Sequence, residues 1–402
     1  MRIIITDTTL SGPLIGGGHL FLPKLLRGLI QHYYEVHLVT SGEPHERIRE
    51  LLQDTGVTIH SDIWNKHDFV ERSSRVFAKW INEIKPDVYL VSASQDIGWV
   101  ALPLLDPGIV TLTIGHTDDE TFYLPARHYS SFLTGAIGVS REICESYIDS
   151  CKLDASMVTW IPYGVETAGS FREETETERL RIIYAGRVEE EQKRISDLIA
   201  IAKILTERDI SYELCIVGDG SEMPRLKQKL GGEIARGSVI LYGWLNGTDV
   251  ITLMRESDIF LLTSDYEGFC IALVEAMANG CCPVVSDIRS GNKDLVVNGE
   301  NGFLVPVGDI NGFIQRLTAL RDDPVKLRNL RRSAWEKGRD FTVQRMVDKY
   351  AGFFNTAMKL ARENPRELSP GFPLLPTCRS KYPDWMRNLK VMARKAVSKF
   401  NK

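Results

Sequence analysis

Short runs of aliphatic residues alternate with longer amphipathic segments along the whole chain. In the first half, such runs predict strands at residues 3–6, 36–40, 57–60, 88–91 and 110–114. These runs have little polar alternation, which is typical of parallel strands covered by helices on both faces. Helical spacing is found between them, at residues 20–30, 48–53 and 70–84. The first half therefore predicts an α/β domain with a doubly wound parallel sheet.

The same alternation restarts after an acidic stretch at residues 173–178, which we interpret as an interdomain linker or an exposed loop. Beyond it, apolar runs predict six further strands, at residues 182–185, 214–217, 239–242, 259–263, 284–286 and 303–305. We expect a first domain over 1–168, a second over 178–340, a helix over 341–364 that returns to the first domain, and a Pro-containing tail over 365–402. Two doubly wound domains would face each other across a cleft, where ligands usually bind.

The most informative segment is residues 267–280, which follows the apolar run at 259–263. Gly268 allows a tight turn and close approach to a ligand. A helix is expected to begin near Ile271 and to end at Gly280. The free backbone N–H groups of its first turn would form an anion site suited to a phosphate. Glu267 and Glu275 would offer acceptors to sugar hydroxyls, so the segment suits a sugar–diphosphate–nucleoside.

This segment resembles the E-x(7)-E motif of the retaining glycosyltransferases of family 4, which have the GT-B fold of two Rossmann-like α/β domains facing a cleft. Other stretches resemble further motifs of that family in the same order, at residues 16–18, 161–165, 185–194, 216–220 and 290–304. The resemblance runs from about residue 1 to 360. Six motifs in the right order are far more specific than any one of them.

The resemblance implies roles for individual residues. Arg187 and Lys193 would neutralise the donor diphosphate, which helps the nucleoside diphosphate to leave. Glu267 would bind hydroxyls of the donor sugar, and His116 would lie near the reacting sugar. The donor-binding residues implied are Gly17 and Gly18 over the diphosphate, Gly268, Phe269, Cys270 and Ile271 at the phosphate and sugar, Glu275 at the ribose, and Trp244 and Leu245 at the base pocket.

The family transfers sugars with retention at the anomeric carbon, by a route in which the departing phosphate serves as the base. Glu267 would therefore position the sugar without acting as a nucleophile, unlike the carboxylates of glycoside hydrolases. The chain has no Asp-x-Asp triplet, the metal-binding signature of the other large glycosyltransferase fold. Together with Arg187 and Lys193, this implies catalysis without a metal, and no cofactor is expected.

Some positions depart from the family pattern. Asp294 stands where Glu is usual, Tyr163 where Asn is common and Glu166 where Asp is common, and the spacing from Arg187 to Lys193 is one residue longer than the commonest form. None of these changes removes a charge that the donor needs. Tyr163 could alter the hinge or the acceptor side.

Several site residues also have plain structural interpretations. Glu267 and Glu275 could be solvated charges at a helix end, and Arg187 could pair with Glu189. Arg194, next to Lys193, is the alternative phosphate ligand. Residues 16–18 could form only a flexible turn, and a histidine placed like His116, after a strand, is often structural.

Composition and charge exclude several other classes of protein. The chain has 402 residues and a net charge of −4, which argues against a nucleic-acid-binding surface over the whole molecule. Seven cysteines without a Cys-x-x-Cys pair predict buried, reduced thiols, and the scattered histidines predict no metal site. The first residues do not form a signal peptide and no apolar run reaches 18 residues, so the cytoplasm is the expected compartment.

The net charge conceals a strongly basic tail. Residues 379–402 contain eight Lys or Arg and one acid, a net charge of +7, so the rest of the chain carries −11. At helical spacing, Trp385, Leu389, Met392, Ala396 and Phe400 gather on one face and basic residues on the other. This pattern predicts an amphipathic helix on an anionic membrane surface; the alternative is a helix that docks on the protein itself, or a frayed end.

We expect a retaining glycosyltransferase that moves a sugar from a nucleoside-diphosphate sugar to a hydroxyl acceptor. UDP is the nucleotide that the family uses most. The acceptor would be a glycan or a lipid-linked intermediate of surface-glycan or glycolipid synthesis, as the basic tail suggests. The alternatives are an epimerase or phosphorylase with the same fold and a non-catalytic subunit that binds nucleotide sugars. The complete set of donor residues favours transfer, and no pyridoxal-binding lysine motif is evident.

Overall fold

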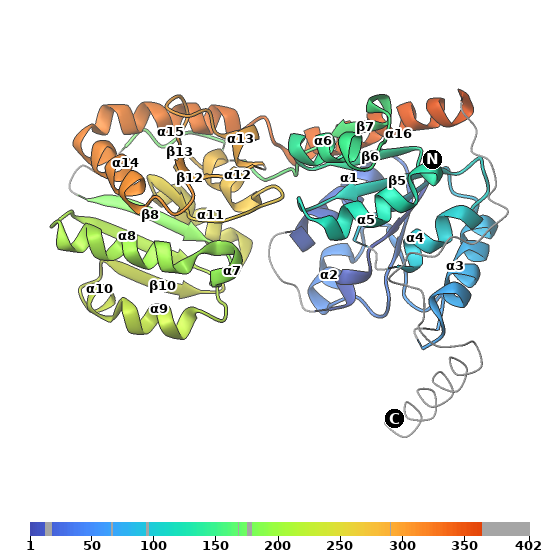
Figure 1. The fold of residues 1–402 in the computed structure, drawn as a ribbon, viewed down its shortest axis with the longest axis horizontal. Coiled ribbons are helices and arrows are strands. Elements are labelled where there is room, and N and C mark those ends of the chain that lie inside the picture. The colour runs from blue at the N-terminus through green and yellow to red at the C-terminus, as the bar shows by residue number, and fades with distance from the viewer. Residues whose placement is uncertain are drawn as a thin grey trace, which may run out of the picture.

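The computed structural model describes residues 1–12, 18–65, 67–93, 96–167, 169–174, 179–289 and 291–363. It contains two α/β domains that lie side by side (Figure 1). The basic tail at 379–402 and the glycines at 16 and 17 lie outside the described residues.

The first domain is built on a seven-stranded parallel sheet with the strand order β3-β2-β1-β4-β5-β6-β7. Its strands are Arg2–Thr6 (β1), Glu35–Val39 (β2), Thr58–His60 (β3), Val88–Val91 (β4), Val110–Gly115 (β5), Gly135–Gly138 (β6) and Val158–Trp160 (β7). The five predicted strands are confirmed at nearly the same residues. The sequence did not predict β6 and β7, because β6 begins and ends with glycine and β7 has only three residues.

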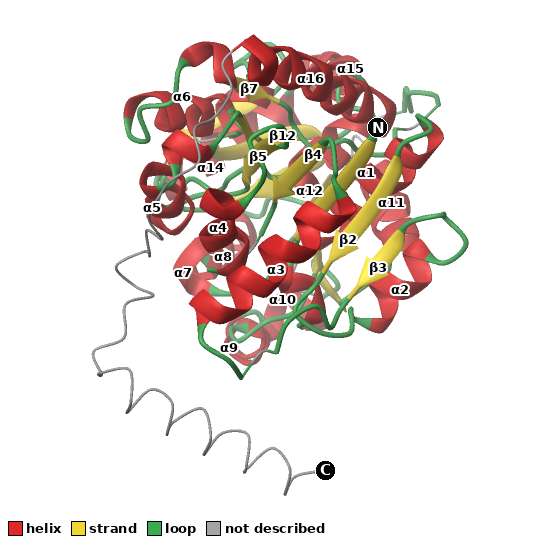
Figure 2. Cartoon of the chain, turned by 90° about the vertical axis from the view of Figure 1, so that its right-hand side faces the viewer, coloured by secondary structure: helices red, strands yellow, loops and turns green. Residues whose placement is uncertain are grey.

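Helices lie on both faces of this sheet (Figure 2). They are Gly18–Gln31 (α1), Glu46–Leu52 (α2), Val70–Ile84 (α3), Ile97–Ala101 (α4), Glu120–His128 (α5) and Arg141–Asp149 (α6), with short 3-10 turns at Thr8–Ser11, Leu102–Leu104, Ser130–Phe132 and Ala155–Met157. Helix α3 shows why the helical spacing was a reliable signal. Its buried residues include two pairs, Ser74 with Ala78 and Phe77 with Ile81. The members of each pair are four residues apart, so they form one stripe of the helix that packs against the core.

The second domain has a six-stranded parallel sheet with the order β10-β9-β8-β11-β12-β13. Its strands are Leu180–Ala185 (β8), Tyr212–Val217 (β9), Val239–Gly243 (β10), Ile259–Leu262 (β11), Cys282–Asp287 (β12) and Phe303–Pro306 (β13). Its helices are Glu190–Lys193 (α7), Ile195–Glu207 (α8), Met223–Lys229 (α9), Gly231–Ala235 (α10), Gly247–Glu256 (α11), Ile271–Ala278 (α12), Asn292–Leu295 (α13), Ile310–Asp322 (α14) and Pro324–Gly338 (α15). All six predicted strands are present.

The last described helix, Val343–Glu363 (α16), leaves the second domain and lies along the first (Figure 1). It packs against α1 so closely that a Cβ atom at Gly28 would lie 2.3 Å from Cγ2 of Val347. The Val165 N–H donates to the Phe341 carbonyl at 2.8 Å where the two crossing segments meet. The chain therefore passes between the domains twice at the same place, and these two segments form the hinge.

A buried arginine fastens the start of the acidic stretch to the second domain. Arg331 is fully buried, forms an ion pair with Asp258 at 3.1 Å, and donates to the Glu174 carbonyl at 2.9 Å. Asp258 also binds Arg172 at 2.7 Å. The described part of the stretch thus belongs structurally to the second domain, and residues 175–178 lie outside the described part of the chain.

Candidate functional site

The sequence-predicted site residues converge at the carboxyl ends of parallel strands. Arg187 follows β8 and Glu267 follows β11, which are neighbours in the second sheet. Strand order reverses direction between these two strands, and ligands of open α/β sheets bind in the crevice at such a switch point. His116 follows β5 of the first sheet and faces this crevice from the other domain.

Lys193 and Glu267 form an ion pair in the interior of the site. Their residues are 8% and 7% exposed. The Ser264 hydroxyl donates to Oε1 of Glu267 at 2.7 Å, and the Gln192 amide donates to Oε2 at 3.4 Å. A buried charge pair with these additional hydrogen bonds is held in one geometry. Burial alone would lower the pKa of Lys193, but the attraction of Glu267 outweighs it and the pKa is raised, so the ammonium stays charged.

Arg187 lies at the same end of β8 but is more exposed than Lys193. Its guanidinium forms an ion pair with Glu189 at 2.9 Å and also donates to the Gln192 side chain. Gln192 in turn bonds to Glu267, so Arg187 and Lys193 are connected through one amide. The pairing of Arg187 with Glu189, which was its structural interpretation, is therefore present in the structure.

Arg194 points to a different group of residues from Lys193. It adopts the left-handed conformation, with φ of 50°, at the junction of α7 and α8. Its guanidinium binds Asp197 at 2.7 Å and lies 3.7 Å from Asp265. The turn thus separates the two neighbouring cations, with Lys193 facing Glu267 and Arg194 facing these two aspartates. This arrangement favours Lys193 over Arg194 as the phosphate ligand.

The N-terminus of α12 presents unpaired backbone donors beside the ion pair. Cys270 is the N-cap residue, and no side chain caps the helix. Within the described residues, the N–H groups of Cys270 and Ile271 have no acceptor, as expected of a first helical turn. Burial raises the pKa of the Cys270 thiol to about 12, so this side chain is neutral and does not oppose an anion.

Glu275 lies one turn further along α12 and is partly buried. Burial raises the pKa of its carboxyl group, while Lys24 of α1 lowers it and Glu166 raises it again. The charge of Lys24 therefore acts on Glu275 from the first domain. Ionised Glu275 has no hydrogen-bonded partner among the described residues, which leaves both oxygens available to a ligand.

Gly268 is a point of close approach between the second domain and the first. A Cβ atom there would lie 2.0 Å from the carbonyl oxygen of His116 and 2.9 Å from Cα of Thr117. Any other residue would push the two domains apart. The sequence suggested Gly268 as a place for close approach to a ligand; the structure gives it a contact with the opposite domain.

Both ring nitrogens of His116 are occupied. Nε2 lies 3.0 Å from the Ser92 hydroxyl and Nδ1 lies 2.6 Å from the Tyr163 hydroxyl. Ser92 donates its only hydrogen to Asp7 at 3.2 Å, because a carboxylate can only accept. Ser92 therefore accepts from Nε2–H. The two hydrogen bonds hold the ring between Ser92 and Tyr163, which indicates a positioning part for this side chain.

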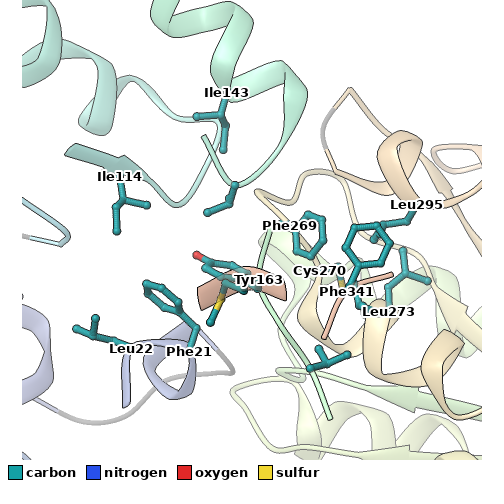
Figure 3. Close-up of a cluster of buried hydrophobic side chains, with 14 of the residues drawn as sticks. Phe21, Leu22, Ile114, Ile143, Tyr163, Phe269, Cys270, Leu273, Leu295 and Phe341 are labelled. Carbon is teal, nitrogen blue, oxygen red and sulfur yellow. The ribbon is translucent and has the colours of Figure 1, made fainter. Parts of the chain in front are cut away.

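Tyr163 lies between the domains in an aromatic cluster (Figure 3). Its ring centre is 4.8 Å from that of Phe21 in α1 and 5.8 Å from that of Phe269, the residue before the α12 cap. Burial raises the pKa of the Tyr163 phenol well above its ordinary value, so its hydroxyl stays protonated. Tyr163, which stands where the family commonly has Asn, thus forms a hydrogen bond with His116 and an apolar contact with Phe269.

Trp244 marks the outer end of the cleft. The Arg47 guanidinium of α2 lies 4.8 Å from the centre of its ring, and an adjoining cavity of about 470 Å³ is lined by both domains. The lining includes His45, Glu50 and Asn246. Leu245 packs against the core and is partly buried. Trp244 is 63% exposed, so its indole is accessible from the cleft.

The remaining predictions concern glycines and metals. Gly18 is the first residue of α1, and Gly17 lies outside the described residues. Among the residues that the structure describes, no group of three His, Cys, Asp or Glu side chains could hold a metal ion. In the same part of the chain, no helix is long and apolar enough to cross a membrane.

Comparison with known proteins agrees with this fold. Residues 15–168 match the sequence model of Glycosyltransferase Family 4, and residues 167–340 match that of Glycosyl transferases group 1. Anabaena HepE in complex with UDP and glucose superimposes with a TM-score of 0.69 at 18% identity, over 89% of this chain and 100% of that one. The fold is therefore GT-B. The two adjoining matches place the chain among the glycosyltransferases of the group 1, family 4 type.

Two relatives indicate the breadth of this group. The chain is 36% identical over 127 residues to the UDP-Gal:alpha-D-GlcNAc-diphosphoundecaprenol alpha-1,3-galactosyltransferase of Escherichia coli, which is 31% of this chain and 32% of that protein. It is 26% identical over 323 residues to the phosphatidyl-myo-inositol mannosyltransferase of Mycolicibacterium smegmatis, covering 77% and 82%. The match thus spans about a third of the first relative and most of the second.

The sequence did not identify every residue that shapes the site. Ser92, Gln192 and Ser264 bind the predicted residues directly, and the charge of Lys24 in the other domain lowers the pKa of Glu275. Gln192 precedes Lys193 in the chain and Ser264 follows the strand before Glu267, so their positions beside the motif gave a usable signal. Ser92 and Lys24 lie far from it in sequence, and only the fold brings them near.

Proposed function

We propose that this protein is a retaining glycosyltransferase that moves a sugar from a nucleoside-diphosphate sugar, with UDP as the nucleotide, to a hydroxyl acceptor. One observation carries the proposal. The buried Lys193–Glu267 pair stands beside the open N-terminus of α12 at the switch point of the second sheet. A cation and helix N–H groups suit a diphosphate, and a carboxylate beside them suits sugar hydroxyls.

In this proposal the charges of the chain itself stabilise the leaving group. Lys193 and Arg187 neutralise the developing diphosphate charge, with no metal or cofactor required. Glu267 keeps the donor sugar in place through its hydroxyls, and its own position is fixed by Ser264 and Gln192. Glu275 binds the ribose, and Trp244 flanks the base. The leaving phosphate removes the acceptor proton, so retention needs no protein nucleophile.

The acceptor is proposed to be a glycan or a lipid-linked hydroxyl compound. The names of the two relatives refer to a diphosphoundecaprenol-linked sugar and to phosphatidyl-myo-inositol, which supports an acceptor of this kind. The same chemistry would place the protein in cell-surface glycan or glycolipid synthesis, at the cytoplasmic face of a membrane.

The donor site is tested with a panel of UDP-, GDP- and ADP-sugars, by thermal shift and by slow donor hydrolysis. Binding of a UDP-sugar and release of UDP are expected. Glu267→Ala and Lys193→Ala should each abolish turnover, whereas Lys229→Ala, an exposed lysine of α9, should not. Wild-type turnover in both site variants would show that the site lies elsewhere.

The same panel separates the alternatives. An epimerase would return an altered nucleotide sugar without releasing UDP, and a phosphorylase would require inorganic phosphate for turnover. A non-catalytic subunit would bind the donor and release nothing. Transfer to an acceptor with the anomeric configuration preserved is the result that the proposal requires.

The basic tail at 379–402 is proposed to hold the protein on an anionic membrane. This proposal rests on the sequence, since these residues lie outside the described part of the chain. Removal of 379–402 should release the protein from anionic vesicles and leave donor hydrolysis unchanged. Unchanged vesicle binding after the deletion would contradict the proposal.

A further inference from the structure

Four cations gather where the chain crosses between the domains. They are Arg141 at the start of α6, Lys337 near the end of α15, and Arg345 and Lys349, one turn apart on α16. We refer to these four residues as the hinge cations. They come from both domains and from the helix that crosses between them. Chain segments distant in sequence thus bring like charges to one place.

Two aromatic rings form the floor beneath these charges. The Arg141 guanidinium lies 4.3 Å from the ring centre of Trp160, and Nζ of Lys349 lies 5.0 Å from the same centre. Nζ of Lys337 lies 5.6 Å from the ring centre of Phe341, and the two rings are 6.4 Å apart. Arg141 and Lys349 are therefore at most about 9 Å apart. The π faces partly offset the repulsion between the cations.

Carboxylates neutralise only part of this charge. Asp294 accepts from the Arg141 backbone N–H at 2.9 Å and forms an ion pair with its guanidinium at 3.6 Å, and Asp340 binds Arg345 at 2.5 Å. Lys337 and Lys349 have no carboxylate partner among the described residues. After burial, Arg141 is the strongest influence that lowers the pKa of Lys349, followed by Arg345. Like charges therefore act on Lys349 more strongly than the carboxylate of Asp340 does.

We propose that the hinge cations bind a phosphate group. A phosphate offers several acceptor oxygens and up to two negative charges, so one group can engage more than one cation. None of the hinge cations is among the predicted donor residues. The ring centre of Phe341 lies 5.6 Å from Nζ of Lys337 and 6.0 Å from the ring centre of Phe269. A phosphate bound here would connect Arg141 of the first domain with Lys337 of the second. The phosphate comes either from a phospholipid headgroup or from a soluble phosphate.

The first arm of the test measures acetylation of single lysines by mass spectrometry on the full-length protein. Inorganic phosphate should slow acetylation of Lys337 and Lys349 about fivefold relative to chloride at equal ionic strength. Lys359 on the same helix serves as the internal control, because it is 77% exposed and pairs with Glu363. Its acetylation should not change.

The second arm measures sedimentation with vesicles of phosphatidylglycerol or of phosphatidylcholine. Lys349→Gln should weaken binding to phosphatidylglycerol vesicles about fivefold, and the matched control Lys359→Gln should not. The basic tail is present in both variants, so its contribution cancels. Donor hydrolysis should be equal in both, which separates this site from the proposed catalytic one.

The two arms identify the source of the phosphate. Protection by inorganic phosphate alone supports a soluble ligand, and a vesicle effect alone supports a phospholipid headgroup. Effects in both arms support a site that accepts either. If phosphate protects no lysine and the two variants bind vesicles equally, the proposal is overturned.

Discussion

At the scale of single residues, hydrogen bonds determine how the side chains of the site are positioned. A chain of hydrogen bonds runs from Asp7 through Ser92 and His116 to Tyr163. Sequence reasoning identified His116 by its place after a strand, and Tyr163 by its departure from the family pattern. It could not foresee that the two side chains bond to each other, because 47 residues separate them.

Tyr163→Phe removes the hydroxyl that lies 2.6 Å from Nδ1 of His116. We expect a loss of about 1–2 kcal/mol in the free energy of unfolding, because a buried hydrogen bond is lost. Donor turnover should also fall. Urea denaturation and donor hydrolysis measure the two effects.

Tyr350→Phe is the matched control for this change. The Tyr350 hydroxyl is buried and has no hydrogen-bond partner among the described residues, so its removal should leave stability unchanged or slightly raised. Equal effects of the two substitutions would contradict the assignment of Tyr163 as the residue that positions His116.

Glu275→Gln should stabilise the protein without donor at neutral pH. Burial raises the folded-state pKa of Glu275 above its ordinary value of 4.5. The contribution of this group to stability is therefore full below about pH 4.5 and is lost as the pH rises through the folded-state pKa. Thermal unfolding should show a higher Tm for the variant at pH 7 and no difference near pH 4, while donor affinity falls. A variant that is less stable than the wild type at pH 7 would contradict this interpretation.

At the scale of elements, the long apolar runs predicted the fold, but they did not predict its shortest strands and helices. All eleven predicted strands are present, whereas β6 and β7 are too short or too rich in glycine to form a recognisable run. Helix α7 is another short element, and its four residues decide which of two adjacent cations faces the site. The sequence left Lys193 and Arg194 as alternatives because spacing alone does not define a left-handed turn.

The turn between α7 and α8 can be tested without removing it. Arg194→Gly preserves the left-handed conformation, which glycine adopts without strain, and removes only partly exposed ion pairs. We expect near-unchanged stability and donor affinity. Arg194→Val should lower both, because a β-branched residue is strained at φ of 50° and Lys193 would be misplaced.

Isothermal titration calorimetry measures the donor affinity of both Arg194 variants, and Lys193→Ala serves as the comparison. If Arg194→Gly weakened donor binding as much as Lys193→Ala does, Arg194 would be the phosphate ligand after all.

At the scale of the whole molecule, the site exists only where the two domains meet. The sequence predicted two domains and a cleft, and the second domain supplies most of the predicted donor residues. The contacts across the cleft could not be predicted, because they join residues with no relation in sequence: Gly268 with His116, Arg47 with Trp244, and Asp294 with Arg141. Asp294 is one of the departures from the family pattern, and here its carboxylate accepts from the first N–H of α6 in the opposite domain.

Gly268→Ala tests whether this contact between the domains is required for turnover. The added Cβ would lie 2.0 Å from the His116 carbonyl oxygen, far inside van der Waals contact, so the domains must separate or tilt. Each domain retains its own core, and we expect a small change in thermal stability, a larger radius of gyration in X-ray scattering and a strong loss of turnover. Gly247→Ala is the control, because nothing lies within 4 Å of the Cβ position at the start of α11. Scattering curves and turnover that match this control would mean that the approach of Gly268 to His116 is incidental to the function of the cleft.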